Sequence, residues 1–221
     1  MASALVFELS KVQTPHVREA MVGHLLHIDR DLAQHVADGL ALAALPKAPA
    51  AAPVQDMKPS AALQIIGKMK DTLEGRCVAI LINDGSDGNT VAALRKAAGD
   101  AGAAVKIVAP KVGGARLADA SMLAADGQLA GTPSVMFDAV AVLLSPAGAQ
   151  ALCSEAAAVD FVRDAFGHLK AIAIDEGGQT LLQRAGVTPD AGVVATTDTA
   201  RFIAAAKTRQ WAREASIRTL A

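Results

Sequence analysis

The feature that most constrains the fold is a set of five short apolar segments, separated by stretches whose apolar residues recur at helical spacing. The first, Cys77–Ile82, is a continuous apolar run bounded by Gly75 and by the turn residues 83–88. Such a run is typical of a strand that is buried on both faces of a parallel sheet. The other four segments are Ala104–Ala109, 140–144, 171–174 and 192–195.

Helical patterns fill the intervals between these segments. Residues 90–101 place Val91, Leu94 and Ala98 on one face, and the pattern stops at Gly102, as expected of a helix that crosses from one strand to the next. Parallel strands joined by right-handed crossovers form an open sheet with helices on both faces. The sequence therefore predicts a three-layer, doubly wound, mainly parallel α/β sheet of the flavodoxin-like kind.

Three further stretches complete this predicted domain, which we place at residues 61–221. Apolar residues at helical spacing over 61–73 predict one amphipathic helix that leads into the domain. Residues 113–137 contain several glycines and isolated apolar residues, so we expect short extra strands and turns there. Asp198 is expected to cap a closing helix that carries Phe202 toward the sheet.

The N-terminal part, residues 1–42, is predicted to be a short helical segment. Thr14 followed by Pro15 predicts a helix start, and Gly39 predicts a helix stop, which gives two or three helices. The apolar residues at helical spacing are Val17, Met21, Leu25, Ile28, Leu32 and Val36. This face has little within the segment to pack against, so we expect it to contact a partner.

An alanine-rich linker is predicted between the two parts, over residues 43–60. It contains Pro46, Pro49, Pro53 and Pro59. Proline lacks a backbone N–H and resists both helix and sheet, so this stretch is expected to be extended.

Composition and charge limit the classes of function. No apolar run reaches the roughly 20 residues that cross a bilayer, and the chain starts with Glu8 and Lys11 among its apolar residues, unlike a secretory signal. We therefore expect a soluble, cytoplasmic protein with no membrane partner. Its 21 basic and 22 acidic residues give a formal net charge of -1. Because no run rich in lysine and arginine is present, nucleic acid is not an expected partner either.

The loop of residues 83–88 lies where nucleotide-binding folds carry their phosphate loop, just before a helix. The G-x-G-x-x-G pattern is missing, and Asp84 and Asp87 would repel a phosphate. We favour an acidic turn that caps the following helix over a nucleotide site.

The turn after residues 171–174 is the place where a strand could present a nucleophile to a cleft. This elbow offers only carboxylates, Asp175 and Glu176, and no activating partner is evident in the sequence. Because the N-terminus of a helix attracts negative charge, capping of the next helix is the favoured role for either residue.

The histidines do not form a recognisable metal-binding pattern. The five are His16, His24, His27, His35 and His168. His24 and His27 lie about one helical turn apart, but no nearby cysteine or glutamate completes a set of ligands. We expect His168 to be a surface or capping residue, and we assign no metal site.

Cys77 and Cys153 are the only cysteines, and neither has a partner at metal-binding spacing. We expect two buried free thiols rather than a disulfide or a zinc site. Cys153 lies beside Glu155 and is expected to be unreactive. No residue is assigned as catalytic or as binding a cofactor.

Several longer runs carry a resemblance that covers nearly the whole chain. They are residues 4–12, 17–25, 66–76, 105–111, 125–134 and 157–171. Together they resemble the carboxy-terminal end of the large-subunit catalases. The first two runs look like the last helices of the catalase core, and the others look like that family's extra C-terminal domain.

The resemblance implies a fold and a parent activity, but not a site on this chain. The C-terminal domain of the family is similar to the glutamine amidotransferase and intracellular protease superfamily, whose active members keep a cysteine at the elbow that here holds Asp175 and Glu176. Catalases break down hydrogen peroxide at a haem whose iron is held by a tyrosine. This sequence contains no tyrosine, so no residue can inherit that role.

The leading hypothesis is therefore a non-catalytic accessory domain that supports a stable catalase tetramer and has holdase-like binding as a related role. Its expected partner is a catalase core or a second copy of the chain, reached through the N-terminal helices, with no cofactor in this chain. Two alternatives stay open. One is an enzyme of the amidotransferase or intracellular protease kind that acts through Cys153, Cys77 or the acidic elbow. The other is a catalase subunit that acts only with a haem-bearing partner.

Overall fold

The computed structural model describes residues 1–47 and 57–217, and the chain divides into two compact units, Met1–Leu63 and Gln64–Ala221. Each unit has its own buried core and is described by itself. Pro49 and Pro53 of the predicted linker lie outside the described residues. Within the described ranges, no helix combines the length and the apolar character that crossing a bilayer requires.

Three short helices form the N-terminal unit: α1 (Ala2–Ser10), α2 (Pro15–Leu25) and α3 (Arg30–Gly39). Thr14 and Pro15 start α2 as predicted, but the Thr14 side chain does not accept a capping hydrogen bond. The break before α3 was not predicted. Asp29 causes it, because its carboxylate caps α3 by accepting a hydrogen bond from the Leu32 amide at 2.8 Å.

The prediction that the N-terminal apolar face lacks a partner of its own is wrong for part of that face. Leu25 and Val36 are buried in a small core that the three helices form together. The helices pack on one another because α3 contacts both α1 and α2. Val17, Met21 and Ile28 stay outside this core, with exposed fractions of 42%, 37% and 74%.

The amphipathic helix predicted for residues 61–73 is absent. The chain there forms isolated turns, and Leu63 and Ile66 are exposed. Gly67 has a φ of 86°, a left-handed conformation that interrupts an α-helix. Only Leu73, next to the first strand, is fully buried. The helical spacing of apolar residues was therefore misleading in this stretch.

The C-terminal unit is built on a parallel sheet of six strands in the order β5-β2-β1-β6-β7-β8. The strands are β1 (Cys77–Ile82), β2 (Ala104–Ala109), β5 (Gly127–Gln128), β6 (Ala139–Leu143), β7 (Ile172–Ile174) and β8 (Val193–Ala195). Five of them are the predicted strands to within a residue or so. The predicted doubly wound, flavodoxin-like fold is confirmed.

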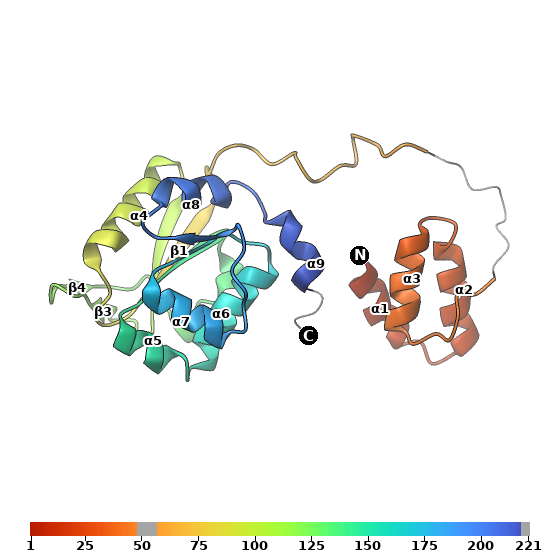
Figure 1. Ribbon diagram of the computed structural model, residues 1–221, viewed down its shortest axis with the longest axis horizontal. Helices are drawn as coiled ribbons and strands as arrows, with labels where there is room; N and C mark the ends of the chain where they lie inside the picture. The colour runs from red at the N-terminus through yellow and green to blue at the C-terminus, as the bar shows by residue number, and fades with distance from the viewer. Residues whose placement is uncertain (48–56, 218–221) are drawn as a thin grey trace. The chain divides into compact units, whose positions relative to one another are not determined.

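Short irregular elements fill residues 113–137, as predicted. β3 (Ala115–Arg116) and β4 (Met122–Leu123) form a small antiparallel pair that extends away from the sheet (Figure 1). The next strand, β5, pairs with β2 as the sixth strand of the main sheet, which the sequence did not predict as a sheet member. Two 3₁₀ turns follow, η1 (Leu129–Gly131) and η2 (Ser134–Met136).

Helices cover both faces of the sheet (Figure 1). On one face lie α4 (Gly88–Asp100) and α8 (Thr199–Ala206), which bury Leu94 and Phe202 against it. On the other lie α5 (Pro146–Leu152), α6 (Ala156–Gly167) and α7 (Glu176–Arg184), which bury Phe161 and Leu181. Side chains of a strand alternate between the faces, so each of the central strands contributes to both cores. The chain then ends in η3 (Trp211–Arg213) and α9 (Glu214–Ile217).

Candidate functional site

The strand order reverses direction between β1 and β6, where the chain first builds one side of the sheet and then the other. In open α/β sheets, ligands bind outside the carboxyl ends of the strands at such a switch point. The residues that follow β1 and β6, from Asn83 and from Leu144 onward, meet at this edge.

Asn83 joins the two loops at the switch point. Its Oδ1 accepts hydrogen bonds from the Ser145 amide at 3.1 Å and from the Ser86 hydroxyl at 3.2 Å. The Ser86 hydroxyl also accepts a hydrogen bond from the backbone N–H of Asn83 at 2.9 Å, and it lies 2.7 Å from the Leu143 carbonyl oxygen. A Cβ at Gly148 of α5 would overlap the side-chain amide of Asn83, so a larger residue there would force Asn83 out of these hydrogen bonds.

The acidic residues of the loop have the structural role predicted for them. Asp87 caps α4 by accepting hydrogen bonds from the amides of Asn89 and Thr90 at 3.1 and 3.2 Å. A hydrogen bond from the Thr90 hydroxyl and another from the Asn89 amide lower the pKa of Asp87 below its usual value. Asp84 accepts a hydrogen bond from the Arg116 amide at 2.8 Å. The interpretation as an acidic, helix-capping turn is confirmed.

The elbow after β7 is held by its aspartate. Asp175 caps α7, because one carboxylate oxygen accepts from the Gly178 amide at 2.7 Å. The other oxygen accepts from the Leu144 amide at 2.9 Å, a bond to the end of β6 that the sequence did not predict. Burial raises the pKa of Asp175, although these two amides favour the charged form. The predicted capping role of this residue is confirmed.

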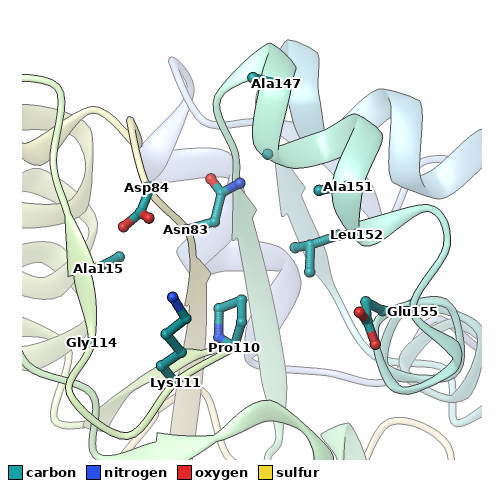
Figure 2. Close-up of a pocket in the computed structure, with 11 residues that line it drawn as sticks. Asn83, Asp84, Pro110, Lys111, Gly114, Ala115, Ala147, Ala151, Leu152 and Glu155 are labelled. Carbon is teal, nitrogen blue, oxygen red and sulfur yellow. The ribbon is translucent and has the colours of Figure 1, made fainter.

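A cleft of about 370 Å³ opens beside this edge (Figure 2). Its floor includes Asn83, Gly148 and Leu152, and its rim carries the charged groups of Asp84, Lys111 and Glu155. Figure 2 shows the Lys111 side chain directed from the β2 end of the cleft toward Asn83 and Asp84. The elbow residue Asp175 does not line this cleft.

The cysteines lie apart from each other and from the elbow. Cys77 starts β1 at the amino edge of the sheet, and Cys153 follows α5. Both are free, as predicted, but both are half-buried rather than fully buried. Burial raises the pKa of the Cys77 thiol, and Lys106 only partly opposes this effect.

The histidines are placed as isolated polar residues. His24 and His35 are exposed, and no cluster of three or more possible metal ligands occurs in residues 1–47 and 57–217. His168 ends α6, and its Nδ1 lies 2.8 Å from the Asp164 carbonyl oxygen. The prediction of a capping histidine is confirmed at that position.

The sequence did not predict that Lys170 is a buried titratable group. Its side chain is buried just before β7, and its Nζ donates to the Ser134 carbonyl oxygen at 2.5 Å. Burial, together with the nearby Arg209 charge, lowers the pKa of Lys170 to about 8. The sequence shows only that Lys170 stands directly before an apolar strand. That position does not distinguish a buried lysine from an exposed one.

Fold and site together define a doubly wound α/β domain whose elbow carries an aspartate engaged in structural hydrogen bonds. The sequence model of the C-terminal domain found in long catalases matches residues 74–210, and a catalase-related, immune-responsive model matches residues 1–40. The chain therefore belongs to the long, large-subunit catalases, as their C-terminal domain.

Known catalases show the same similarity along the chain. Catalase C of Rhizobium meliloti (strain 1021) is 44% identical over 99% of the chain and 32% of its own length. Catalase HPII of Pseudomonas aeruginosa is 36% identical over 88% of the chain and 27% of its own length. Catalase-2 of Bacillus subtilis (strain 168) is 31% identical over 93% of the chain and 29% of its own length. The chain thus spans about a third or less of the length of these relatives.

Proposed function

We propose that this chain is a non-catalytic accessory domain of a large-subunit haem catalase, and that hydrogen peroxide is broken down by other parts of that class of protein. The observation that carries the proposal is the complete lack of tyrosine in the sequence. In catalases a tyrosine phenolate is the axial ligand of the haem iron. The residues present therefore do not fit haem in the way that the parent family binds it.

The elbow supports the same proposal. A nucleophile must have a free, activated atom that faces a cleft. Both carboxylate oxygens of Asp175 are engaged by backbone amides, which makes this residue a link between β6 and α7. The alternative of an amidotransferase-like or protease-like enzyme would need Glu176, Cys77 or Cys153 instead. Glu176 lines a separate cleft together with Asp175, and neither cysteine lies at the elbow.

We propose further that the exposed apolar residues of the N-terminal unit contact a catalase core or a second copy of the chain. Phe7 and Ile28 have exposed fractions of 62% and 74%, and Val17 and Met21 are also exposed. Apolar side chains gathered on such a small helical unit are typical of an interaction surface. In a full assembly this contact would support a stable tetramer.

The contact is tested by sedimentation velocity of the chain, alone and mixed with a long catalase from which the C-terminal domain has been removed. We expect the chain either to self-associate or to sediment with the truncated catalase. The double variant Phe7→Ser/Ile28→Ser should lose this association. The control variant Met57→Ser/Val112→Ser, which also removes two exposed apolar side chains, should keep it. The proposal would be contradicted if the chain sedimented as a monomer both alone and in the presence of the truncated catalase. Equal association of the two double variants would contradict it as well.

Holdase-like binding of unfolded proteins is proposed as a related role of the same exposed residues. The test is light scattering of a heated client protein in the presence of the chain. We expect the chain to reduce aggregation and Phe7→Ser/Ile28→Ser to reduce it less. Aggregation that is unchanged by an excess of the chain would remove this part of the proposal.

A further inference from the structure

A second pocket opens at the amino ends of the strands, on the edge of the sheet opposite to the switch point. Its lining includes Asp138, which directly precedes β6, and Lys170, which stands two residues before β7. Arg209, which follows α8, and the η2 residues Val135 and Met136 also line it. Its volume of about 410 Å³ lies within the range of small-molecule sites, which is about 300 to 1,000 Å³.

Lys170 is a buried lysine without a counter-ion. It is 3% exposed, and no carboxylate oxygen in the described part of the chain lies within 4.0 Å of its Nζ. The carboxylates of Asp138 and Asp164 favour its charged form only from a longer distance. Lysine is almost never fully buried unless it is paired, because an uncompensated charge in the interior is costly. A negative group on a ligand would remove that cost.

The ammonium group of Lys170 has N–H groups left for a ligand. It carries three donors, and the structure shows one hydrogen bond, to the Ser134 carbonyl oxygen at 2.5 Å. Ser134 starts η2, and the two residues that follow it line the pocket. The ammonium group therefore lies at the wall that Val135 and Met136 form.

The charges around the pocket favour an anion with a single negative charge. Arg209 adds a second positive group, and its side chain is 30% exposed. Among the described residues that line the pocket, Asp138 carries the only negative charge. One of its oxygens lies 3.4 Å from the Arg209 guanidinium, and the other accepts from the Cys77 backbone N–H at 3.0 Å. With His168 neutral, the lining has one positive charge in excess, which a monoanion would neutralise.

We propose that this pocket binds a small organic carboxylate with a short apolar chain. The carboxylate accepts from Lys170 Nζ and pairs with Arg209 through charge-assisted hydrogen bonds. The apolar chain lies along Val135 and Met136, whose exposed fractions are 57% and 62%. This pocket is separate from the elbow and from the N-terminal unit, so the inference goes beyond the accessory role proposed above.

The test is isothermal titration calorimetry of the whole chain with butyrate, in a buffer low in chloride because chloride competes for cationic sites. We expect a dissociation constant of about 1 mM. Butyramide has nearly the same shape without the charge, so it should bind at least about tenfold more weakly. Sulfate is the dianionic comparison and should also bind more weakly than butyrate.

Replacement of the buried lysine locates the site. Lys170→Met keeps the length of the side chain and removes its charge, so it should weaken butyrate binding about tenfold or more. Lys207→Met is the matched control, because Lys207 pairs with Asp71 and does not line the pocket. This control should bind butyrate as the wild type does.

A second pair of variants keeps the test decisive if Lys170→Met does not fold. Met136→Glu places a negative charge at the exposed rim of the pocket, so it should weaken butyrate binding about fivefold. Met136→Gln changes the same side chain without a charge, and it should weaken binding by less than about twofold.

Three results would overturn the proposal. The first is that butyrate does not bind at concentrations up to about 10 mM. The second is that butyramide or sulfate binds as tightly as butyrate. The third is butyrate binding that is the same in the wild type, in a folded Lys170→Met and in Met136→Glu. None of these results bears on haem or on assembly, so failure of this proposal is distinguishable from failure of the proposed function.

Discussion

The guanidinium group of Arg213 is enclosed near the end of the chain, with none of the side chain exposed. It forms a paired contact with Asp190, at 2.6 Å from Nε and 2.8 Å from one terminal nitrogen. The other terminal nitrogen donates to the carbonyl oxygens of Phe166 and Lys170. The guanidinium also lies 3.9 Å from the centre of the Phe166 ring. This one side chain therefore fixes η3 to α6 and to the loop before β8.

Replacement of Arg213 should destabilise the C-terminal unit strongly. We expect Arg213→Met to lower the free energy of unfolding by about 3 kcal/mol, because it leaves Asp190 and two buried carbonyl groups without their partner. Arg213→Lys keeps the charge but cannot form the two-pronged contact, so it should lose a large part of that energy as well. Urea denaturation measures both. A loss below about 0.5 kcal/mol for Arg213→Met would contradict this role.

The same pair makes stability depend on pH. Burial opposes ionisation of Asp190, but the Arg213 hydrogen bond and charge outweigh it, so the pKa of Asp190 lies below its ordinary value of 3.8. A lowered carboxyl pKa stabilises the folded state above the unfolded-state pKa, and this contribution is lost as the pH falls through the folded-state value. The difference in free energy of unfolding between wild type and Arg213→Met should therefore be largest at pH 7 and should become smaller below about pH 4. A difference that grows in acid would contradict the assignment.

The thiol of Cys77 offers a chemical test of the non-enzymatic account. Burial raises its pKa, so the reactive thiolate is scarce at neutral pH. In the variant Cys153→Ser, where Cys77 is the only thiol, we expect iodoacetamide to react more slowly with the native protein than with the denatured protein at pH 8. Mass spectrometry of quenched samples measures the two rates. A native thiol that reacts faster than the denatured one would favour the enzymatic alternative.

At the scale of elements, the first turn of α7 packs unusually closely on the end of β6. A Cβ at Gly177 would overlap the carbonyl oxygen of Leu144, and one at Gly178 would lie 2.6 Å from the carbonyl oxygen of Val142. Backbone atoms cannot swing aside as a flexible side chain can. This close approach is what lets Asp175 reach the Leu144 amide while it caps the helix.

We therefore expect Gly177→Ala to destabilise the domain by about 3 kcal/mol. Gly99 in α4 is the matched control, because a Cβ there would meet no atom within 4 Å. Gly99→Ala should stabilise the protein by up to about 1 kcal/mol, since alanine favours a helix over glycine. Thermal unfolding of the two variants gives the comparison. Equal effects of both substitutions would show that the packing of α7 is not tight.

Much of this architecture was predictable from local patterns. The strand Cys77–Ile82 follows from a continuous apolar run, and the caps at Asp87, Asp175 and Asp198 follow from an acidic residue directly before a helix. The helix predicted for residues 61–73 was wrong because apolar spacing says nothing about Gly67, whose backbone leaves the helical region. Spacing also continues across Asp29, so it did not show the break between α2 and α3.

The candidate site was less predictable, because it depends on contacts between residues that are distant in sequence. Asn83 was visible as the first residue after a strand, but its contact with Gly148 depends on the start of α5 lying beside the loop that follows β1. Lys111 faces the same cleft only because β2 lies beside β1. The environments of Lys170 and Arg213 likewise arise from tertiary packing, and no local pattern encodes them.

At the scale of the whole molecule, the two units differ greatly in the size of their cores. The N-terminal unit buries six apolar residues in its own cluster, Leu9, Val22, Leu25, Ala33, Val36 and Ala37. The C-terminal unit buries two larger clusters, one on each face of its sheet. Small units bury a smaller fraction of their surface and are correspondingly less stable. The N-terminal helices should therefore depend more on a partner than the sheet domain does.

We expect the two units to unfold at different urea concentrations. Trp211 is the only tryptophan and lies in the C-terminal unit, so its fluorescence reports on that unit, whereas far-ultraviolet circular dichroism reports on the helices of both. The dichroism signal should begin to fall before the fluorescence changes. Coincident curves would mean that the chain unfolds as one cooperative unit.

We propose that this chain, which lacks tyrosine, does not hold a catalytic haem in the manner of its family. The direct measurement is to incubate the purified chain with haem, remove unbound haem by gel filtration, and record the Soret absorbance and the release of oxygen from hydrogen peroxide. We expect no retained Soret band and no more oxygen than free haem produces. A chain that keeps haem through the column and releases oxygen faster than free haem, with no other polypeptide present, would contradict the account.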